Sequence, residues 1–396
     1  MLNGPSPRVA IFTAYFTPAE KAGGPVRSID NLVKAIAPNT NLFVITSDRD
    51  HGAAERMPEV TSDTWQKYFG ATVIYLSRKS ETLGALRTVI RQLRPDTIYL
   101  NSLFEFRYSI LVLILAYLHI IPFGTILLAP RGELQEGNFA IKRTRKRLFL
   151  AIGKSFGLFR GIQWHATSQD EAEDIVRMMN VSADNILVIR NLRTESAHSD
   201  RTNAEDAEDS KLRVLFLGRV SKEKNLAYAL RVLLKVCRRV QFDVFGNYED
   251  AEYLDDCRRL AAAQSANVQV TFHGHLPHSL VTSTILKYDI MFLPTVGENY
   301  GHSIVESLLA GTPVLISDQT PWRNLERQQI GWDLPLRDPA AFTRVLESYG
   351  NEELPRFPRV KVQDYARELF DDRKTLAQYV ARFSLKNHGY SRHGLD

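Results

Sequence analysis

Two carboxylates flank a glycine in the segment LPTVGENYGHSIVESLLAGTPVLISD, residues 293–318. A predicted strand ends before Glu298, and Gly301 allows a sharp turn into a helix that is predicted to begin near His302 and to carry Glu306 in its second turn. The first amides of such a helix have no partner within it, so they suit a phosphate group. These amides belong to Gly301, His302, Ser303 and Ile304.

The two glutamates suit a different part of a ligand. Carboxylates repel phosphate, but they accept hydrogen bonds from sugar hydroxyls on either side of it. For Glu306 the alternative is an ordinary solvent-exposed position on a helix. The apolar stretch LLAGTPVLI that follows favours a buried carboxylate, which needs partners.

A second group of charged residues lies between the strand RVLFLG and the helix LAYALRVLLKV. Gly218 ends the strand, and Arg219 and Lys224 follow on the loop, five residues apart. A guanidinium binds two oxygens and an ammonium adds a point charge, so the two side chains suit one polyanion. The alternative is that both cations are solvated on an exposed loop.

The first strand of the chain leads to a comparable loop, AYFTPAEKAGGPVRS. Gly23 and Gly24 allow a ligand to approach the backbone, and the helix predicted to begin about Pro25 has an N-terminus that favours an anion. An ordinary turn is the alternative. The loop lacks the GxGxxG pattern, so a dinucleotide fingerprint is absent.

Short apolar strands alternate with helical patterns along the chain, so parallel βαβ units are expected to position these loops. Helical periodicity is seen at 26–36, 83–93 and 171–179. In the first half, strands are predicted at 9–13, 42–46, 72–76, 97–100, 125–129, 162–166 and 186–189. In the second half, they are predicted at 214–217, 242–245, 268–272, 290–294 and 314–316.

A polar, acidic segment at 196–211 separates the two halves and is typical of a linker. The predicted fold class is α/β, with two doubly wound, Rossmann-like domains at 1–195 and 212–360 that face a cleft. Such clefts usually bind ligands. A C-terminal helical segment at 361–396 is expected to pack back towards the first domain.

The composition fits an ordinary globular protein. The chain has 396 residues, of which 44% are hydrophobic and 24% charged, which excludes collagen and wholesale disorder. Cys237 and Cys257 cannot form a disulfide framework and lie in no CxxC zinc spacing, so a reducing compartment is expected. Residues 1–20 show no signal-peptide pattern. The net charge of +5 is too mild to imply a nucleic-acid partner.

One apolar stretch, residues 108–128, could be mistaken for a membrane span. A spanning helix needs about 20 uninterrupted apolar residues. His119, Pro122 and Gly124 interrupt this stretch, so a buried helix at 107–119 and a buried strand at 124–129 are predicted instead.

Together these motifs resemble the retaining GT-B glycosyltransferases of family 4. Glu298 and Glu306, with seven residues between them and Asn-Tyr-Gly after the first, resemble the signature of that family. Residues 218–224 resemble its diphosphate clamp, and residues 23–24 its N-domain glycine loop. Two segments further resemble a bacterial surface-polysaccharide subgroup, 129–147 and 293–336.

The resemblance implies a role for each residue at a nucleotide-sugar donor. Arg219 and Lys224 would neutralise the donor diphosphate and the charge that develops on the leaving nucleotide. Glu306 would bind the ribose hydroxyls. Glu298 would bind the transferred sugar with help from nearby backbone amides, which belong to Asn299, Tyr300, Gly301 and His302.

The resemblance also bears on the nucleobase and on metals. Loops that contact the base in the family align with Gly246, His275 and Leu276. Family members need neither a metal nor another cofactor, and the sequence has no DxD-type acidic pair near these motifs. The donor would be a UDP- or GDP-linked sugar, and the Arg/Lys pair would do the work of a metal.

The chain departs from the family after the fifth predicted strand. Many members carry a histidine there that faces the reacting sugar, whereas this sequence has Ala-Pro-Arg131-Gly-Glu133. Arg131 becomes the candidate for contact with the sugar or a phosphate-bearing acceptor, and Glu133 for orienting an acceptor hydroxyl. A structural pair between the two is the alternative. Asn101 and Ser102, which follow the preceding predicted strand, are candidates for the same acceptor-binding surface.

Residues 139–160 combine cations with apolar side chains. Such a helix suits an anionic membrane surface, or it is a solvated face packed on the core. Acceptors in the subgroup are commonly polyprenyl-linked saccharides, which agrees with membrane contact. No nucleic-acid-binding module is recognisable. The cations are Lys142, Arg143, Arg145, Lys146, Arg147, Lys154 and Arg160.

The expected function is transfer of a hexose from a nucleotide sugar to a glycan or lipid-linked saccharide, with retention of configuration, in cell-surface polysaccharide biosynthesis. The expected location is the cytoplasm or the inner face of the cytoplasmic membrane. Two alternatives are a nucleotide-sugar epimerase of related fold and a non-catalytic protein that binds sugar nucleotides.

Overall fold

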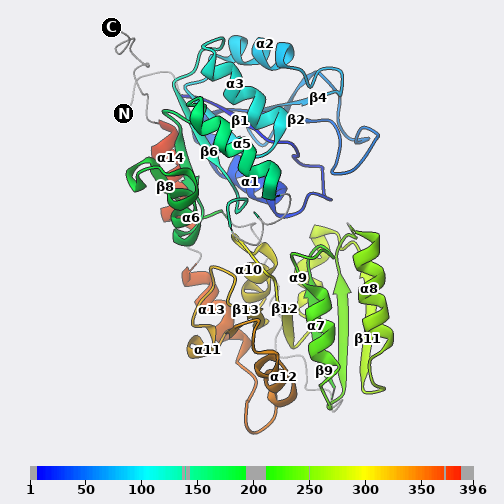
Figure 1. Ribbon diagram of the computed structural model, residues 1–396. Helices are drawn as coiled ribbons and strands as arrows, with labels where there is room; N and C mark the ends of the chain where they lie inside the picture. Colours follow the sequence, from blue (N-terminus) through cyan, green and yellow to red (C-terminus); the bar gives the residue numbers. More distant parts are fainter. Residues whose placement is uncertain are drawn as a thin grey trace. The chain divides into compact units, whose positions relative to one another are not determined.

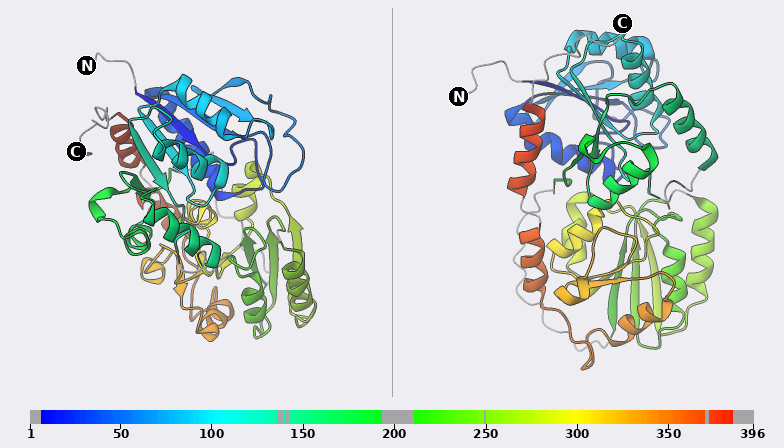
Figure 2. Two further views of the ribbon diagram at one scale, coloured as in Figure 1. Left: turned by 45° about the horizontal axis from the view of Figure 1, so that its top comes forward. Right: turned by 60° about the vertical axis from the view of Figure 1, so that its left-hand side comes forward.

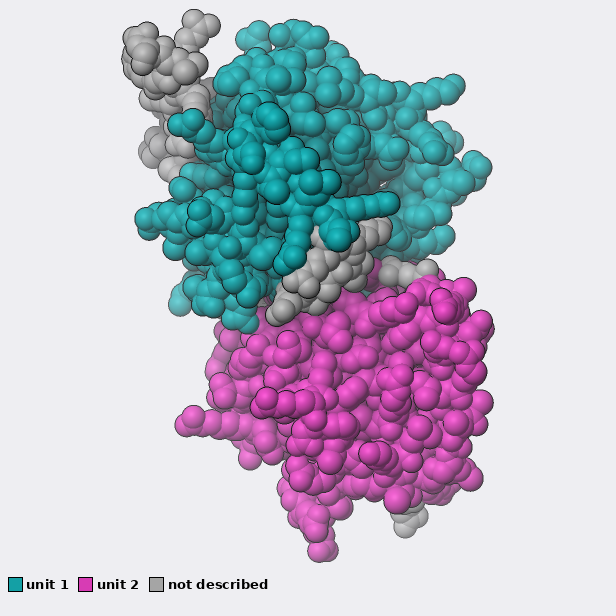
Figure 3. Space-filling model, viewed as in Figure 1, with its two compact units in different colours: residues 1–194, 372–396 teal, residues 195–371 magenta. Residues whose placement is uncertain are grey.

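The computed structural model describes residues 7–135, 139, 143–192, 211–248, 250–369 and 372–384. The chain divides into two compact units, shown in different colours in Figure 3. Unit 1 comprises Met1–Thr194 and Asp372–Asp396, and unit 2 comprises Glu195–Asp371. Of the segments discussed above, residues 196–210 of the acidic linker, Lys142, and residues 370–371 and 385–396 of the C-terminal segment lie outside the described residues.

Unit 1 is built on a sheet with the strand order β3-β4-β2-β1-β5-β6-β7-β8. Neighbouring strands are parallel except β3 and β4, which are antiparallel. The strand order reverses at β1, which lies between β2 and β5. The strands are β1 (Arg8–Phe12), β2 (Asn41–Ser47), β3 (Trp65–Tyr68), β4 (Ala71–Leu76), β5 (Thr97–Asn101), β6 (Thr125–Ala129), β7 (Gln163–Ala166) and β8 (Ile186–Val188).

Side chains of this sheet alternate between two apolar cores. On β1, Ala10 and Phe12 belong to one core, and Val9 and Ile11 belong to the other. Helices cover both faces, so the strands are continuously apolar and the unit is doubly wound, as predicted. The helical elements are α1 (Gly24–Ile36), η1 (Ala37–Asn39), α2 (Leu83–Leu93), η2 (Phe106–Ile110), α3 (Leu111–Tyr117), α5 (Arg143–Ser155), α6 (Gln169–Met179), η3 (Ala183–Asn185) and α14 (Asp372–Ser384).

Unit 2 has a wholly parallel sheet with the order β11-β10-β9-β12-β13-β14. The strand order reverses at β9, which lies between β10 and β12. The sheet lies between helices (Figure 1, Figure 2). The strands are β9 (Leu212–Leu217), β10 (Val240–Phe245), β11 (Val268–Gly274), β12 (Ile290–Leu293), β13 (Val314–Ser317) and β14 (Gly331–Leu334). The helices are α7 (Leu226–Leu233), α8 (Ala251–Ala262), η4 (His278–Leu280), α9 (Val281–Ile285), α10 (His302–Leu309), α11 (Leu325–Gln328), α12 (Pro339–Ser348) and α13 (Arg359–Leu369).

The apolar stretch at 108–128 is confirmed as a helical segment followed by a strand. A π-helical turn, η2, runs into α3, and β6 follows as a fully buried strand. Among the described residues, none of the helices combines the length and the apolar character that crossing a membrane requires.

The described part of the C-terminal segment is helical. It forms two helices that belong to different units. α13 packs against α10 in unit 2. α14 packs against α1 and buries Tyr379 and Phe383 in a core of unit 1. α13 and α14 belong to different units because each buries its apolar side chains in the core of its own unit.

Candidate active site

Two loops of unit 2 are tied together where the strand order reverses. The loop after β9 and the loop after β12 follow adjacent strands, so both start at the same edge of the sheet. The N–H of Val296 and the hydroxyl of Thr295 donate to the carbonyl of Glu223 over 2.9 and 3.0 Å. The amide of Asn225 donates to the carbonyl of Pro294 over 3.0 Å. These hydrogen bonds, two of which come from the side chains of Thr295 and Asn225, hold the loop of the predicted clamp against the loop that carries Glu298.

The charged side chains of these loops form one cluster. Lys224 Nζ lies 2.5 Å from Glu298 Oε2 and 3.3 Å from Glu223 Oε1. Arg219 Nη2 lies 3.5 Å from Glu223 Oε2. The structure therefore brings together Arg219, Lys224 and Glu298 from separate motifs. It adds Glu223, which the sequence analysis missed although it stands between the two cations in VSKEKN.

Lys224 keeps its positive charge within this cluster. Its side chain is only 12% exposed. Burial by itself lowers the pKa of the ammonium, but the charges of Glu298 and Glu223 outweigh burial and hold the pKa above its ordinary value. At neutral pH the site therefore holds a fixed cation that can donate to a phosphate oxygen as well as to the carboxylates.

Gly301 shapes the start of α10 beside this cluster. Its φ of 75° lies in the left-handed region, and a Cβ there would come within 2.8 Å of Ile304 Cδ1 and 3.1 Å of Glu298 Cγ. Gly301 is also the N-cap of α10, and no side chain caps the helix. The N-terminus of α10 thus carries no side-chain cap, and the helix dipole there favours an anion.

Glu306 lies in the second turn of α10 and is largely buried, with 10% of its side chain exposed. This excludes the alternative of an ordinary solvent-exposed glutamate. Its Oε1 lies 3.8 Å from Nδ1 of His278 in η4. His278 is a neighbour that the sequence analysis did not identify, because η4 comes from a distant part of the chain.

Other predicted donor residues have structural roles in unit 2. The Tyr300 side chain is buried and its carbonyl accepts a hydrogen bond from the indole of Trp322, so this side chain belongs to the core. A Cβ on Gly246 would lie 1.8 Å from the carbonyl oxygen of Gly218, so close backbone approach explains this glycine. Asn299 lies in the loop between Glu298 and α10, and His275 and Leu276 follow β11.

In unit 1, Gly23 and Gly24 start α1 as predicted. Gly23 has a φ of 68° and is the N-cap, and no side chain caps this helix. The N–H groups of Val26 and Arg27 bond to the carbonyl of Gly23. The glycine pair therefore exposes a helix N-terminus on the loop that follows β1.

Arg131 lies after β6 and is held by neutral groups. Its backbone is left-handed, with a φ of 57°, an uncommon conformation for an arginine. Its guanidinium donates to the side-chain oxygens of Asn101, Asn191 and Tyr99. No carboxylate pairs with Arg131 among the described residues. The structure thus holds a fixed, half-buried cation, and no local pattern in the sequence indicates Asn191 as its partner.

Glu133 has a different set of partners, so the alternative of a structural Arg131–Glu133 pair is not found among the described residues. Its carboxylate accepts hydrogen bonds from the hydroxyl of Ser102 over 2.7 Å and from the N–H groups of Leu103 and Phe104 over 2.6 and 3.2 Å. Burial raises its pKa, against the effect of these bonds. These contacts explain Glu133 and Ser102 as residues that shape the loop after β5.

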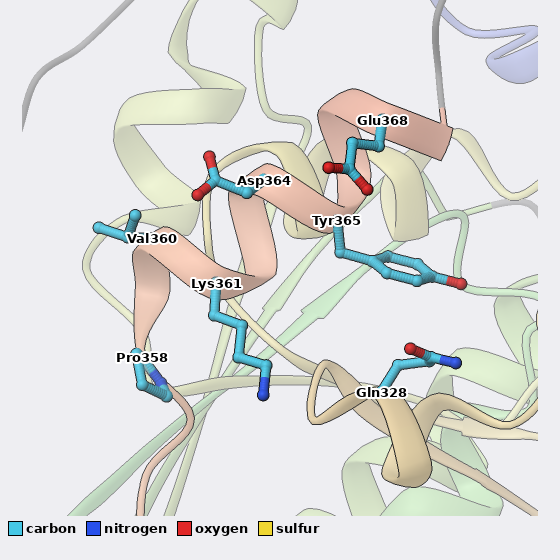
Figure 4. A pocket seen from close by; sticks show the side chains of 7 residues that line it. All are labelled: Gln328, Pro358, Val360, Lys361, Asp364, Tyr365 and Glu368. Carbon is cyan, nitrogen blue, oxygen red and sulfur yellow. The ribbon is translucent and has the colours of Figure 1, made fainter.

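A depression elsewhere in unit 2 has a volume of about 480 Å³ and contains none of the predicted site residues. Figure 4 shows that α13 provides most of its wall and that Gln328 of α11 faces it. Lys361 there donates to the side chain of Gln329. No group of three or more metal-ligating side chains occurs in the part of the chain that the structure describes.

Comparison with known proteins identifies related chains. Residues 200–368 match the family described as glycosyl transferases group 1. An uncharacterised glycosyltransferase of Methanocaldococcus jannaschii is 24% identical over 49% of this chain and 53% of its own length. A phosphatidyl-myo-inositol mannosyltransferase of Mycobacterium tuberculosis is 32% identical over 32% of this chain and 33% of its own length. The match thus spans about half the length of the first relative and less of the second.

Solved structures resemble the chain over nearly its whole length. Sucrose-phosphate synthase of Thermosynechococcus elongatus superposes with a TM-score of 0.72 at 17% identity, covering 95% of this chain and 98% of that one. HepE of Anabaena, solved with UDP and glucose, gives a TM-score of 0.68 at 14% identity, covering 95% and 99%. At these identities the likeness defines the fold. The chain therefore has the GT-B fold predicted from its sequence, and its residues 200–368 match the family model of the group 1 glycosyltransferases.

Proposed function

We propose that this protein is a glycosyltransferase that moves a hexose from a nucleoside-diphosphate sugar to a saccharide acceptor with retention of configuration. One observation carries the proposal. Two cations and a glutamate from adjacent loops meet beside a helix N-terminus that no side chain caps, at the point where the sheet order of unit 2 reverses. Diphosphates and sugar hydroxyls are the groups that such a set of side chains binds.

Each charged residue then has a role in the transfer. Arg219 and Lys224 bind the diphosphate and neutralise the charge that grows on it as the bond to the sugar breaks. Glu298 accepts hydrogen bonds from hydroxyls of the transferred sugar, and Glu306 from those of the ribose. The contact between Lys224 and Glu298 fixes the diphosphate-binding cation relative to the sugar-binding carboxylate. The ammonium can do both because it has three N–H donors.

The bond changes follow from this arrangement. The bond between the anomeric carbon and the diphosphate oxygen breaks, and the acceptor oxygen bonds to the same carbon on the same face. The acceptor proton passes to the leaving diphosphate. In this proposal the two cations supply the electrostatic stabilisation that a metal ion supplies elsewhere, so no metal is required.

Arg131 is proposed to take the place of the histidine that faces the sugar in many members of family 4. Its fixed guanidinium, which only neutral side chains hold among its described partners, suits a negatively charged group of the donor or acceptor. The network would fix the direction of the charge before the ligand binds.

The test begins with the donor. Thermal-shift measurements against UDP-, GDP- and ADP-sugars should show stabilisation by a UDP- or GDP-sugar. With lipid-linked saccharides extracted from bacterial membranes as acceptors, that donor should release its nucleotide, EDTA should not slow the release, and the product should retain its anomeric configuration by NMR. Free epimerised sugar would support an epimerase instead, and binding without turnover would support a non-catalytic protein.

We also propose that α5 touches an anionic membrane, where lipid-linked acceptors reside, in cell-surface polysaccharide biosynthesis at the inner face of the cytoplasmic membrane. The structure divides the apolar residues of 139–160 into two sets. Phe139, Leu150 and Phe159 are buried. Leu148, Ile152 and Phe156, spaced four residues apart, are 62%, 49% and 68% exposed. They form an apolar stripe on the outer face of the segment.

Cations accompany this stripe. Arg145, Arg147, Lys154 and Arg160 are exposed. Lys146 is not one of the surface cations, because its ammonium lies 5.0 Å from the ring centre of Phe104. Apolar insertion and about 1 kcal/mol per cation near anionic lipid are the two contributions that bind such helices to membranes.

Liposome flotation separates membrane contact from a solvated helix face. The chain should float with phosphatidylglycerol vesicles and much less with phosphatidylcholine vesicles. Replacing Leu148, Ile152 and Phe156 by serine should abolish flotation. Val360→Ser, at an equally exposed apolar residue of unit 2, is the matched control. Unchanged flotation of the triple variant would contradict the proposal.

A further inference from the structure

A pocket of about 320 Å³ lies in unit 1 and contains none of the residues discussed so far as ligand contacts. Its walls come from the loops after β1, β2 and β4 and from η2, which follows β5. These strands are adjacent in the order β4-β2-β1-β5, so the loops meet at the carboxyl edge of the sheet where the strand order reverses. Doubly wound sheets bind small molecules at this place, and the volume suits a small ligand.

Guanidinium groups dominate the chemistry of this pocket. Arg49, Arg78 and Arg107 line it, each from a different loop. Arg49 pairs with Asp48 over 2.9 Å and Arg107 with Glu81 over 3.1 Å. Each pair occupies one nitrogen of a group that has five N–H donors. Arg78 makes no hydrogen bond or ion pair within the described part of the chain and is exposed. Most of the donors are thus available to a ligand.

The carboxylates of the pocket are already bound by the protein. Asp50 accepts hydrogen bonds from the N–H groups of Glu20 and Lys21 over 3.0 and 3.1 Å, which ties the β1 loop to the β2 loop. Glu81 is buried and, besides its arginine, accepts from the hydroxyl of Tyr108 over 3.0 Å. An incoming anion therefore meets Arg78, which pairs with no carboxylate among the described residues, and the remaining N–H donors of Arg49 and Arg107.

Neutral groups complete the lining. The Tyr15 hydroxyl lies 3.2 Å from Nδ1 of His51, and Ser47 adds a second hydroxyl. Burial, with the charges of nearby carboxylates, raises the pKa of Tyr15, so its hydroxyl stays protonated and can donate. Residues 52–54 are Gly-Ala-Ala, which leaves their backbone accessible. Hydroxyl groups beside cations suit a polyhydroxylated anion.

We propose that this pocket binds an anionic sugar, a monosaccharide unit that carries a phosphate or a carboxylate. Arg49, Arg78 and Arg107 surround the anionic group, and Tyr15 bonds to a ring hydroxyl. The identification of this sugar as part of the acceptor rests on the proposed glycosyl transfer. The binding of the anionic sugar does not, because every lining residue belongs to unit 1.

Isothermal titration calorimetry with the full chain in low salt tests the proposal. The probes are glucose 6-phosphate, glucuronate, inorganic phosphate and uncharged glucose. At least one of the two anionic sugars should bind at least tenfold more tightly than glucose, and the affinity should fall as salt is added. Arg78→Gln should weaken that binding about tenfold. Arg87→Gln, an exposed arginine of α2 outside the pocket, is the matched control and should leave it unchanged.

The outcomes separate the ligand classes. Tighter binding of glucose 6-phosphate than of glucuronate assigns a phosphorylated sugar, and the reverse assigns a uronic acid. Anionic sugars that bind no better than glucose, or that bind Arg78→Gln as well as the unaltered chain, would overturn the proposal. A parallel titration with UDP distinguishes the proposed glycosyl transfer from the proposed anionic-sugar pocket. If the chain binds UDP but no anionic sugar, only the proposal for the pocket is overturned.

Discussion

The loops after β9 and β12 in unit 2 and the loops after β5 and β6 in unit 1 occupy similar positions, at the carboxyl ends of adjacent parallel strands. Both carry charged residues, yet the charges are used differently. In unit 2, Lys224 and Glu298 pair directly across the two loops. In unit 1, Arg131 and Glu133 are two residues apart in sequence and do not pair.

The difference lies in the partners. Glu133 accepts hydrogen bonds from backbone amides of the loop after β5, so its charge stabilises that loop. Lys224 and Glu298 bond to each other and leave the amides at the start of α10 uncapped. A charged residue after a strand therefore indicates a ligand site only where its charge does not serve as a hydrogen-bond partner of the loop backbone.

The largest effect is expected from a substitution of Lys224. Lys224→Ala removes a buried cation from the proposed diphosphate site, and kcat should fall by about 10²–10³, roughly 3–4 kcal/mol. Nucleotide release from the donor identified by thermal shift measures it. Lys222→Ala is the matched control, since Lys222 is an exposed lysine of the same loop that pairs only weakly with Asp250 over 3.5 Å. Activity of Lys224→Ala close to that of the control would remove Lys224 from the site.

Glu133 should behave in the opposite way. Glu133→Gln leaves buried amides of the β5 loop without their charged acceptor, so the free energy of unfolding should fall by about 2–3 kcal/mol. Urea unfolding followed by circular dichroism measures this, with the exposed Glu55→Gln as control. Normal stability with lost transfer would break the comparison and return Glu133 to the role of an acceptor ligand.

Arg131 tests whether a residue of the unit 1 loops also meets a ligand. Arg131→Met removes the charge, and kcat/KM should fall about tenfold if the guanidinium binds an anionic group. Asn191→Ala removes one of its partners and should lower kcat/KM in the same direction by a smaller factor. A lower Tm with unchanged kcat/KM in both variants would make the network purely structural.

Strands that are buried on both faces, such as β5 and β6, were predicted well, because burial gives them a mostly apolar sequence. The sequence pattern did not predict β3 and β14, at the ends of their sheets. β3 reads Trp-Gln-Lys-Tyr and β14 begins with glycine, so neither contains an apolar run. Edge strands need less burial and leave a weaker pattern.

For the site, spacing along the chain identified Arg219, Lys224 and Glu298, because each follows a recognisable strand. The pairing of Lys224 with Glu298 depends on which strands are neighbours, which local patterns do not encode. The same holds for Asn191 beside Arg131 and for the arginine-lined pocket of unit 1, whose walls come from four separate loops. Glu223, in contrast, stands between the two cations on one loop and was open to sequence reasoning.

The smallest expected effect concerns His165, which lies behind Arg131 and ties α14 to the same network. Its ring contacts the hydroxyls of Tyr99 and Tyr379. Burial lowers the pKa of His165 to about 3. Below about pH 6.5 the imidazole is therefore protonated in the unfolded chain but stays neutral in the folded chain. The free energy of unfolding should therefore fall by about 1 kcal/mol between pH 6.5 and about 5.5. Urea unfolding at several pH values measures this loss. His165→Gln should flatten the dependence, whereas His51→Gln, at an exposed histidine, should not. An equally steep dependence in both variants would show that other groups of unit 1 are responsible.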